Sequence, residues 1–295
     1  MKTRKNVFCM ILTLVMLFAC SACGSTTEKD KTMGEGKQVE NTEKTTDTIV
    51  HSAKDLERIV KTTTGEQQHF ILKEDIVLGM GAISFNGTDI AIDGGDERVT
   101  VTMSSTGGFN FKGVTYPEKV KASSSVTIKN VDFVNDKTEG TDRDDCYVYT
   151  YADNVVYENC TFKGGVIVFG DAKFVNCLFS ETDDLRYCIF VDNEQGRREA
   201  GMNVEITGCN FNGNDTAYGL VKVADDSNVG ATLKVSNCQF QNIANKPAVY
   251  VNGQTQVTTE GTNTYTNCTA GAILAKDDNC TINGEAMIAG TSYEQ

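Results

Sequence analysis

Two adjacent carboxylates and one arginine later in the chain are of the residue types that could do acid–base chemistry. Asp144 and Asp145 are adjacent, and Arg197 lies in the run EQGRREAG. Paired carboxylates can act as general acid and base, and an arginine can hold a substrate carboxylate. These three residues are the candidate catalytic set, provided that folding brings them into one cleft. Triad or metal chemistry based on histidine is not expected, because the chain has only two His, far from any obvious partner.

Tyrosines gather on one short segment, CYVYTY at 146–151. Strict alternation would point Cys146 inward and Tyr147, Tyr149 and Tyr151 outward. Exposed aromatic rings often mark a contact surface, and tyrosine offers a sugar ring both stacking area and a hydroxyl. The alternative is that these rings pack beneath a turn or beneath the insertion at 181–203. The candidate carbohydrate-binding residues are Tyr147, Tyr149, Tyr151, Arg186, Tyr187, Tyr218 and Tyr250.

Acidic pairs near expected turns are the candidate cation ligands. A Ca²⁺ site takes six or more oxygens from several segments. Most acidic pairs at turns, such as Asp225-Asp226, are simply solvated. We therefore expect no cofactor, with Ca²⁺ at Asp183 and Asp184 as the alternative.

The elements that must position these side chains are short strands in a repeat. One octet recurs as VTIKNVDF, VVYENCTF, AKFVNCLF, VEITGCNF, LKVSNCQF and NTYTNCTA, starting at 126, 155, 172, 204, 233 and 263. A second alternating segment recurs as CYVYTY, GVIVFG, YCIFVD, YGLVKV, AVYVNG and GAILAK. Alternation with a period of two, without helical spacing, predicts an all-β solenoid.

Stacked coils place equivalent side chains in ladders about 4.8 Å apart. Asparagine tolerates the left-handed backbone of a turn, and its amide can bond along the stack. The expected turn ladder is Asn130, Asn159, Asn176, Asn237 and Asn267. The expected inward ladders are Cys160, Cys177, Cys209, Cys238 and Cys268, and Phe133, Phe162, Phe179, Phe211 and Phe240.

Eight cysteines follow Cys23, an even number that would suit disulfides in an exported protein. Five of them recur at one repeat position, where cysteine would act as a small buried hydrophobe. We expect buried thiols, with disulfides as the alternative.

These repeats resemble the right-handed parallel β-helix family, the pectin-lyase-like superfold, over about residues 70–290. The resemblance implies a single-stranded all-β solenoid, and the capping-box pattern Ser52-Ala-Lys-Asp55 predicts a short helix over its N-terminal end. It implies no single function, because the superfold contains lyases, hydrolases, esterases and non-enzymes.

Two local similarities point toward enzymes of that superfold. The run RDDC, which contains Asp144 and Asp145, resembles polygalacturonase-like hydrolases, and CYVYTYADNVVYENCTFKGG with the later Gln195-Gly196-Arg197 is similar to pectinesterases. Both catalytic sets are incomplete, because no histidine occurs at Gly164–Val166 and Val166 replaces the pectinesterase acid. The favoured hypothesis is polysaccharide binding or display without catalysis. A divergent polysaccharide lyase, hydrolase or esterase, and a structural or adhesive stalk, are the alternatives.

The N-terminal segment has the composition of an export signal. Residues 1–5 are basic, residues 6–19 are apolar, and Ser21-Ala22 precede Cys23. This resembles a bacterial lipobox, which implies a lipid on Cys23; Cys20 and an ordinary secreted protein are the alternatives. We expect a signal peptide at 1–22, a disordered tether at 23–48 and the β-helix at 49–295. The protein would then be extracytoplasmic, anchored by lipid to the bacterial cell membrane or surface.

The formal net charge of −13 limits the possible partners. An acidic chain repels the phosphates of nucleic acid. It also repels polyuronates unless a cation bridges the two. We expect a monomer whose partners are the membrane, through the lipid, and a polysaccharide.

Overall fold

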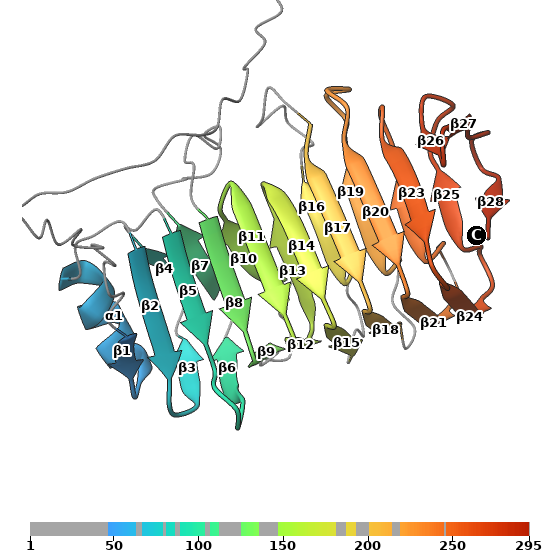
Figure 1. Cartoon of the computed structure of the whole chain (residues 1–295). Helices are drawn as coiled ribbons and strands as arrows, with labels where there is room; N and C mark the ends of the chain where they lie inside the picture. Colours follow the sequence, from blue (N-terminus) through green and yellow to red (C-terminus); the bar gives the residue numbers. More distant parts are fainter. Residues whose placement is uncertain are drawn as a thin grey trace, which may run out of the picture. The chain divides into compact units, whose positions relative to one another are not determined.

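Three sheets of mainly parallel strands run along the described part of the chain (Figure 1). The computed structural model describes residues 47–62, 67–78, 81–85, 89–103, 107–111, 125–135, 147–180, 187–192, 201–213, 219–244 and 246–294. All of them belong to one compact unit.

From β2 to β25, each turn of the chain gives one strand to each sheet in the order A, B, C. Sheet A contains β1 (Asp47–Val50), β2 (Gln67–Leu72), β5 (Asp89–Asp93), β8 (Ser125–Lys129), β11 (Asn154–Glu158), β14 (Asp171–Val175), β17 (Asn203–Thr207), β20 (Thr232–Ser236), β23 (Gln256–Glu260), β26 (Thr281–Ile282) and β27 (Glu285–Ala286). Sheet B contains β3 (Ile76–Leu78), β6 (Val99–Met103), β9 (Val131–Asn135), β12 (Thr161–Lys163), β15 (Leu178–Ser180), β18 (Asn210–Asn212), β21 (Gln239–Ile243) and β24 (Thr264–Cys268). Sheet C contains β4 (Gly81–Phe85), β7 (Gly107–Phe111), β10 (Tyr147–Tyr151), β13 (Gly165–Val168), β16 (Ile189–Asp192), β19 (Val221–Ala224), β22 (Val249–Val251), β25 (Ile273–Ala275) and β28 (Ser292–Tyr293).

Successive coils pair in parallel and in register. On sheet C, for example, Val148 pairs with Val166, and Val166 pairs with Ile189. The only antiparallel pairs among the described strands are β26–β27 and β25–β28, at the C-terminal end of sheets A and C. The predicted all-β parallel β-helix is therefore confirmed.

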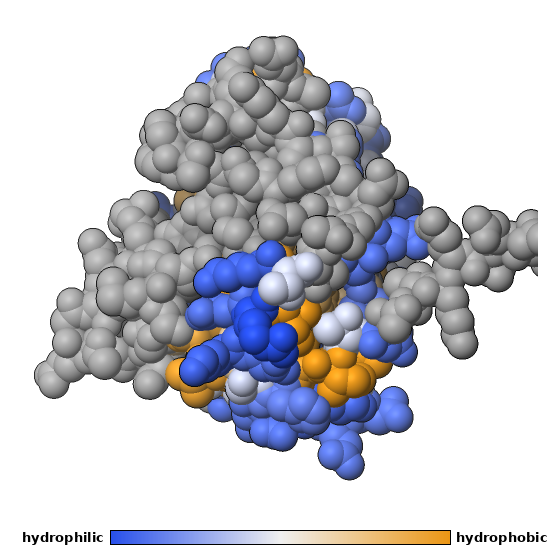
Figure 2. Space-filling view, turned by 90° about the vertical axis from the view of Figure 1, so that its left-hand side faces the viewer, coloured by the Kyte–Doolittle hydropathy of each residue, from blue (hydrophilic) through white to orange (hydrophobic). Residues whose placement is uncertain are grey.

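A short helix, α1 (Ala53–Thr62), lies at the N-terminal end. The backbone amide of Asp55 donates to Ser52 Oγ at 3.1 Å, as the capping pattern predicts. Leu56, Ile59 and Val60 are buried, and the helix contacts β1, β3 and β4. Viewed end-on, the described part of this face is mostly hydrophilic (Figure 2). The predicted capping helix is confirmed.

The first strand starts slightly earlier than the expected domain boundary at 49. Strand β1 begins at Asp47 and pairs in parallel with β2. His69 Nδ1 on β2 lies 2.7 Å from Asp47 Oδ1. Residues 47 and 48 thus belong to the first coil.

Stacked phenylalanines fill the interior beside sheet B. The rings of Phe162 and Phe179 are 4.7 Å apart and 6° from parallel, and Phe211 and Phe240 continue the stack at 4.7 and 4.9 Å. All four side chains are at most 1% exposed. The predicted phenylalanine ladder is confirmed.

Free thiols form a second interior ladder. Cys160, Cys177, Cys209 and Cys238 lie on consecutive coils and are buried. The backbone amide of Cys177 donates to Cys209 Sγ at 3.4 Å. The seven cysteines within the described residues are all free, as expected; Cys146 lies outside them.

Asparagines with left-handed backbone connect sheet A to sheet B. Asn130, Asn159, Asn176 and Asn237 have φ between 52° and 55°. Asn159 Nδ2 donates to Asn130 Oδ1 at 2.7 Å, so the amides bond along the stack as predicted. Gly208 takes the same left-handed turn position on the next coil. A Cβ there would lie 2.4 Å from Asn176 Oδ1, which explains the glycine.

The last octet, 263–270, lies in sheet B, whereas its sequence predicts the position that the other octets take in sheet A. Its strand β24 pairs with β21, so Tyr265 takes the place above Phe240 and stacks on it at 5.1 Å. Asn267 Nδ2 donates to Asn242 Oδ1 at 3.0 Å, on sheet B. Cys268 is paired with Ile243 rather than with Cys238. The prediction that Asn267 and Cys268 end the main ladders is therefore wrong.

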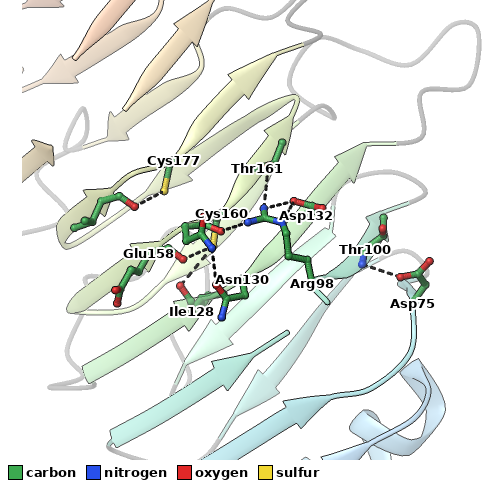
Figure 3. Close-up of polar contacts among 12 residues, drawn as sticks. Asp75, Arg98, Thr100, Ile128, Asn130, Asp132, Glu158, Cys160, Thr161 and Cys177 are labelled. Carbon is green, nitrogen blue, oxygen red and sulfur yellow. Dashed lines mark hydrogen bonds and ion pairs between the residues drawn. The ribbon is translucent and has the colours of Figure 1, made fainter. Parts of the chain in front are cut away.

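Arg98 clamps three coils at the bend between sheets A and B (Figure 3). Its Nε donates to Asp132 Oδ1 at 3.1 Å, its Nη1 to the carbonyl of Asn159 at 2.7 Å and its Nη2 to Thr161 Oγ1 at 2.9 Å. Burial raises the pKa of Asp132, but the hydrogen bonds from Arg98 and Thr161 outweigh it and hold that pKa below its usual value. A charged side chain just before β6 therefore bonds to both β9 and β12.

Candidate functional site

Much of the predicted site lies outside the described residues. These positions are Cys23, Asp144, Asp145, Asp183, Asp184, Arg186, Arg197 and Tyr218. The catalytic and Ca²⁺ hypotheses of the sequence therefore remain predictions, as do the signal peptide, the tether and the lipid anchor. Within the described ranges, no helix combines the length and the apolar character needed to cross a membrane.

The outward face of sheet C is the predicted binding face, and its register is described. Val148 and Thr150 of β10 are buried inward, as alternation predicts. The position between them, Tyr149, belongs to one line of register partners that runs along the stack. This line consists of Tyr149, Ile167, Phe190, Lys222, Tyr250 and Leu274. The register therefore aligns the predicted Tyr149 and Tyr250 on one face.

Two members of this line, Ile167 and Phe190, belong to a second apolar cluster that is separate from the core. Ile167, Phe169, Tyr187 and Phe190 are between 2% and 8% exposed. The Tyr187 and Phe190 rings pack at a centroid distance of 5.8 Å. Tyr187 thus contributes its ring to packing, and this agrees with the alternative in which some of these tyrosines are covered.

Lys222 lies against the same aromatic rings. Its Nζ is 4.9 Å from the centroid of Phe190 and 5.8 Å from that of Tyr187. These distances are within the range of a cation–π contact. The lysine therefore adds a positive charge to an otherwise apolar line of residues, which we call the strip on sheet C.

Tyr250 is an aromatic residue of this line that remains partly exposed to solvent. It packs against the cluster and is half-buried. Burial raises the pKa of Tyr250; Lys276 lowers it, while Asp277 and Asp226 raise it further. The phenol is neutral at physiological pH and can both donate and accept a hydrogen bond. Beside it on the neighbouring strands lie Lys222 and Leu274.

Asp225, expected to be a solvated turn residue, is buried at the turn from sheet C to sheet A. It is 0% exposed, and its carboxylate accepts hydrogen bonds from the backbone amides of Val229, Gly230 and Gln254, each at 3.1 Å. The expectation of a solvated residue is wrong here, because the carboxylate satisfies amides that the turn would otherwise leave unpaired. No cluster of three or more His, Cys, Asp or Glu side chains within the described ranges could hold a metal ion.

Family models, curated proteins and solved structures contain no match to this chain. The function of this chain is therefore inferred from the geometry of its own residues. The residues predicted from the sequence for sheet C include its tyrosines but not Ile167 and Phe190. Alternation of GVIVFG and YCIFVD places both residues on the same face as Tyr149, so the signal was present once the register was known.

Proposed function

We propose that this protein is a lipid-anchored surface protein whose pectin-lyase-like β-helix binds polysaccharide on the outward face of sheet C. The observation that supports this most is the run of partly exposed residues Lys222, Tyr250 and Leu274 on neighbouring strands, next to the buried Phe190. These three partly exposed residues offer an aromatic ring, an aliphatic side chain and one cation on the same face.

The chemistry of this strip suits a sugar chain. The C–H face of a pyranose packs on an aromatic or aliphatic side chain, while its hydroxyls need donors and acceptors at the edge. Tyr250 supplies a ring and a hydroxyl, Leu274 an apolar surface and Lys222 a donor. Because the line advances one coil at a time along the stack, an extended polymer could contact several coils at once.

Binding without catalysis is the form of the proposal. The polygalacturonase-like and pectinesterase sets are incomplete in the sequence, and the strip itself carries no described pair of carboxylates. A divergent polysaccharide-degrading enzyme is the second candidate, on the similarity around Asp144, Asp145 and Arg197. Release of soluble sugar by the purified protein would favour the enzyme.

Electrophoresis in native gels that contain dissolved polysaccharide tests the binding face. We expect the full-length protein to be retarded, and Tyr250→Ala to reduce the retardation at least threefold. Leu178→Ala, at an exposed outward position of sheet B, is the matched control and should migrate as the unmodified protein does. Equal retardation of Tyr250→Ala and the unmodified protein would remove Tyr250 from the site.

The lipid anchor is tested separately. After expression in a bacterial host, the protein should partition into detergent, and Cys23→Ser should move it to the aqueous phase. Cys20→Ser is the matched control and should leave partitioning unchanged. The reverse pattern would assign the lipid to Cys20, and no partitioning at all would indicate an ordinary secreted protein.

A further inference from the structure

We propose a second binding site, a groove on the outward face of sheet A that takes an uncharged, extended polysaccharide. The groove crosses β11, β14, β17 and β20 and has a volume of about 340 Å³. Its lining includes Asp171, Lys173, Asn203, Glu205, Thr232 and Lys234. This site lies on a different sheet from the strip at Tyr250 and does not depend on it.

One edge of the groove is a line of hydrogen-bonding groups. Asp171, Asn203 and Thr232 occupy the same outward position on successive coils. Asp171 Oδ1 accepts from the backbone amide of Asn203 at 2.9 Å, and Thr232 Oγ1 donates to Asn203 Oδ1 at 2.8 Å. These bonds hold the three side chains in place, and Asn203 remains exposed at the centre of the line. A rigid row of amide, hydroxyl and carboxylate groups is preorganised for the hydroxyls of a sugar chain.

The charges along the other edge compensate one another. Lys173 Nζ lies 3.0 Å from Glu205 Oε2, and Lys234 Nζ lies 2.8 Å from Glu260 Oε2. Each lysine is thus balanced by a carboxylate from the next coil, although the whole chain is strongly acidic. The groove therefore has no excess positive charge with which to attract a polyuronate or a nucleic acid.

The backbone of sheet A leaves an extended peptide nothing to pair with here. Strands β14 and β17 are each hydrogen-bonded to a neighbouring coil on both sides. Recognition by strand addition needs a free edge, which these strands do not have. An uncharged chain rich in hydroxyls, which needs only side-chain partners, suits the groove better than a peptide.

The spacing of the groove also fits a polymer. Successive coils are about 4.8 Å apart, which is close to the length of one pyranose in an extended β-linked chain. A chain lying along the stack would therefore meet an equivalent side chain at each sugar. Val156, next to Lys173 in register, gives the groove an apolar position beside its polar edges.

Native gels containing hydroxyethyl cellulose, a soluble uncharged β-linked glucan, test this site with the full-length protein. We expect the double variant Asn203→Ala, Thr232→Val to reduce retardation at least threefold, and Val156→Phe, which fills the groove, to do the same. Gln256→Ala, at the next position of the same line but outside the groove, is the matched control. Equal urea midpoints would show that all variants are folded.

Tyr250→Ala separates this site from the strip on sheet C. If both sites bind the glucan, each set of variants lowers retardation and their combination abolishes it. If the groove variants lower retardation and Tyr250→Ala does not, the groove is supported and the strip fails. Unchanged retardation in both groove variants would overturn the groove.

Discussion

The ring of Phe211 stacks on the ring of Phe179 with centroids 4.7 Å apart and planes 5° from parallel. Phe211 is 0% exposed and also stacks on Phe240. Removal of a fully buried phenylalanine ring leaves a cavity and costs about 3–5 kcal/mol. We expect Phe211→Ala to lower the free energy of unfolding by that amount, measured by urea denaturation.

Leu178→Ala is the control for this prediction. It lies on the neighbouring strand with its side chain 41% exposed. Its effect should stay within about 0.5 kcal/mol. A urea midpoint unchanged in Phe211→Ala would contradict the packed ladder.

Arg98→Met should destabilise the bend between sheets A and B. The variant keeps much of the aliphatic stem but loses the hydrogen bonds to Asp132, Asn159 and Thr161. Because about a third of both charged side chains is exposed, we expect a loss of about 1–2 kcal/mol. Lys129→Met, which breaks the more exposed pair with Glu158, should change the free energy of unfolding by less than about 0.5 kcal/mol. Equal effects of the two variants, measured by urea denaturation, would show that the clamp contributes no more than a surface ion pair.

Asn159 should tolerate glycine better than alanine. Its φ of 53° is left-handed, and a non-glycine residue without a hydrogen-bonding side chain pays roughly 1–2 kcal/mol there. Asn159→Gly loses the bond to Asn130, whereas Asn159→Ala loses the bond and adds strain. Thermal melting should rank the unmodified protein first, glycine second and alanine last; alanine equal to glycine would argue against a strained turn.

Alkaline pH should destabilise the fold through buried thiols whose pKa is raised. The hydrogen bond with Cys160 lowers the pKa of Cys177, but its bond with Cys209 and its burial prevail and raise it to about 12; burial raises the pKa of Cys280 to about 11. Below an ordinary thiol pKa near 9 both states are protonated, and the stability is complete. Above it the unfolded chain releases protons that the folded chain keeps, so stability falls as pH rises from about 9 toward 12.

Urea denaturation at pH 8 and pH 10 measures this effect. The free energy of unfolding should be lower at pH 10, and Cys177→Ala should reduce the difference. A free energy of unfolding that rises between pH 8 and pH 10 would contradict buried, neutral thiols.

Sequence periodicity predicted the coil and most of its ladders, because one side chain per turn must repeat when strands stack in register. It failed at Asn267 and Cys268. An alternating strand followed by Asn and Cys looks the same whether it belongs to sheet A or to sheet B. Here Gly261, with a φ of 63°, takes the left-handed turn position after β23 and lies against Asn237, so the strand that follows belongs to sheet B.

The candidate site was less predictable than the coil. Alternation gives the direction of Tyr187 but not its surroundings, and the structure shows its ring packed on Phe190. The partners of Arg98 come from residues 34 to 63 positions later, a separation that local pattern reasoning does not join. The groove on sheet A likewise depends on which short and long side chains neighbour one another across four coils.

Polysaccharide binding by this β-helix is the central prediction. Co-sedimentation of the full-length protein with a panel of insoluble polysaccharides, with and without Ca²⁺, tests this most directly if each supernatant is also assayed for released sugar. We predict that the protein sediments with at least one polysaccharide and releases no sugar. Protein that stays in the supernatant with every polysaccharide would contradict polysaccharide binding and favour a structural or adhesive stalk.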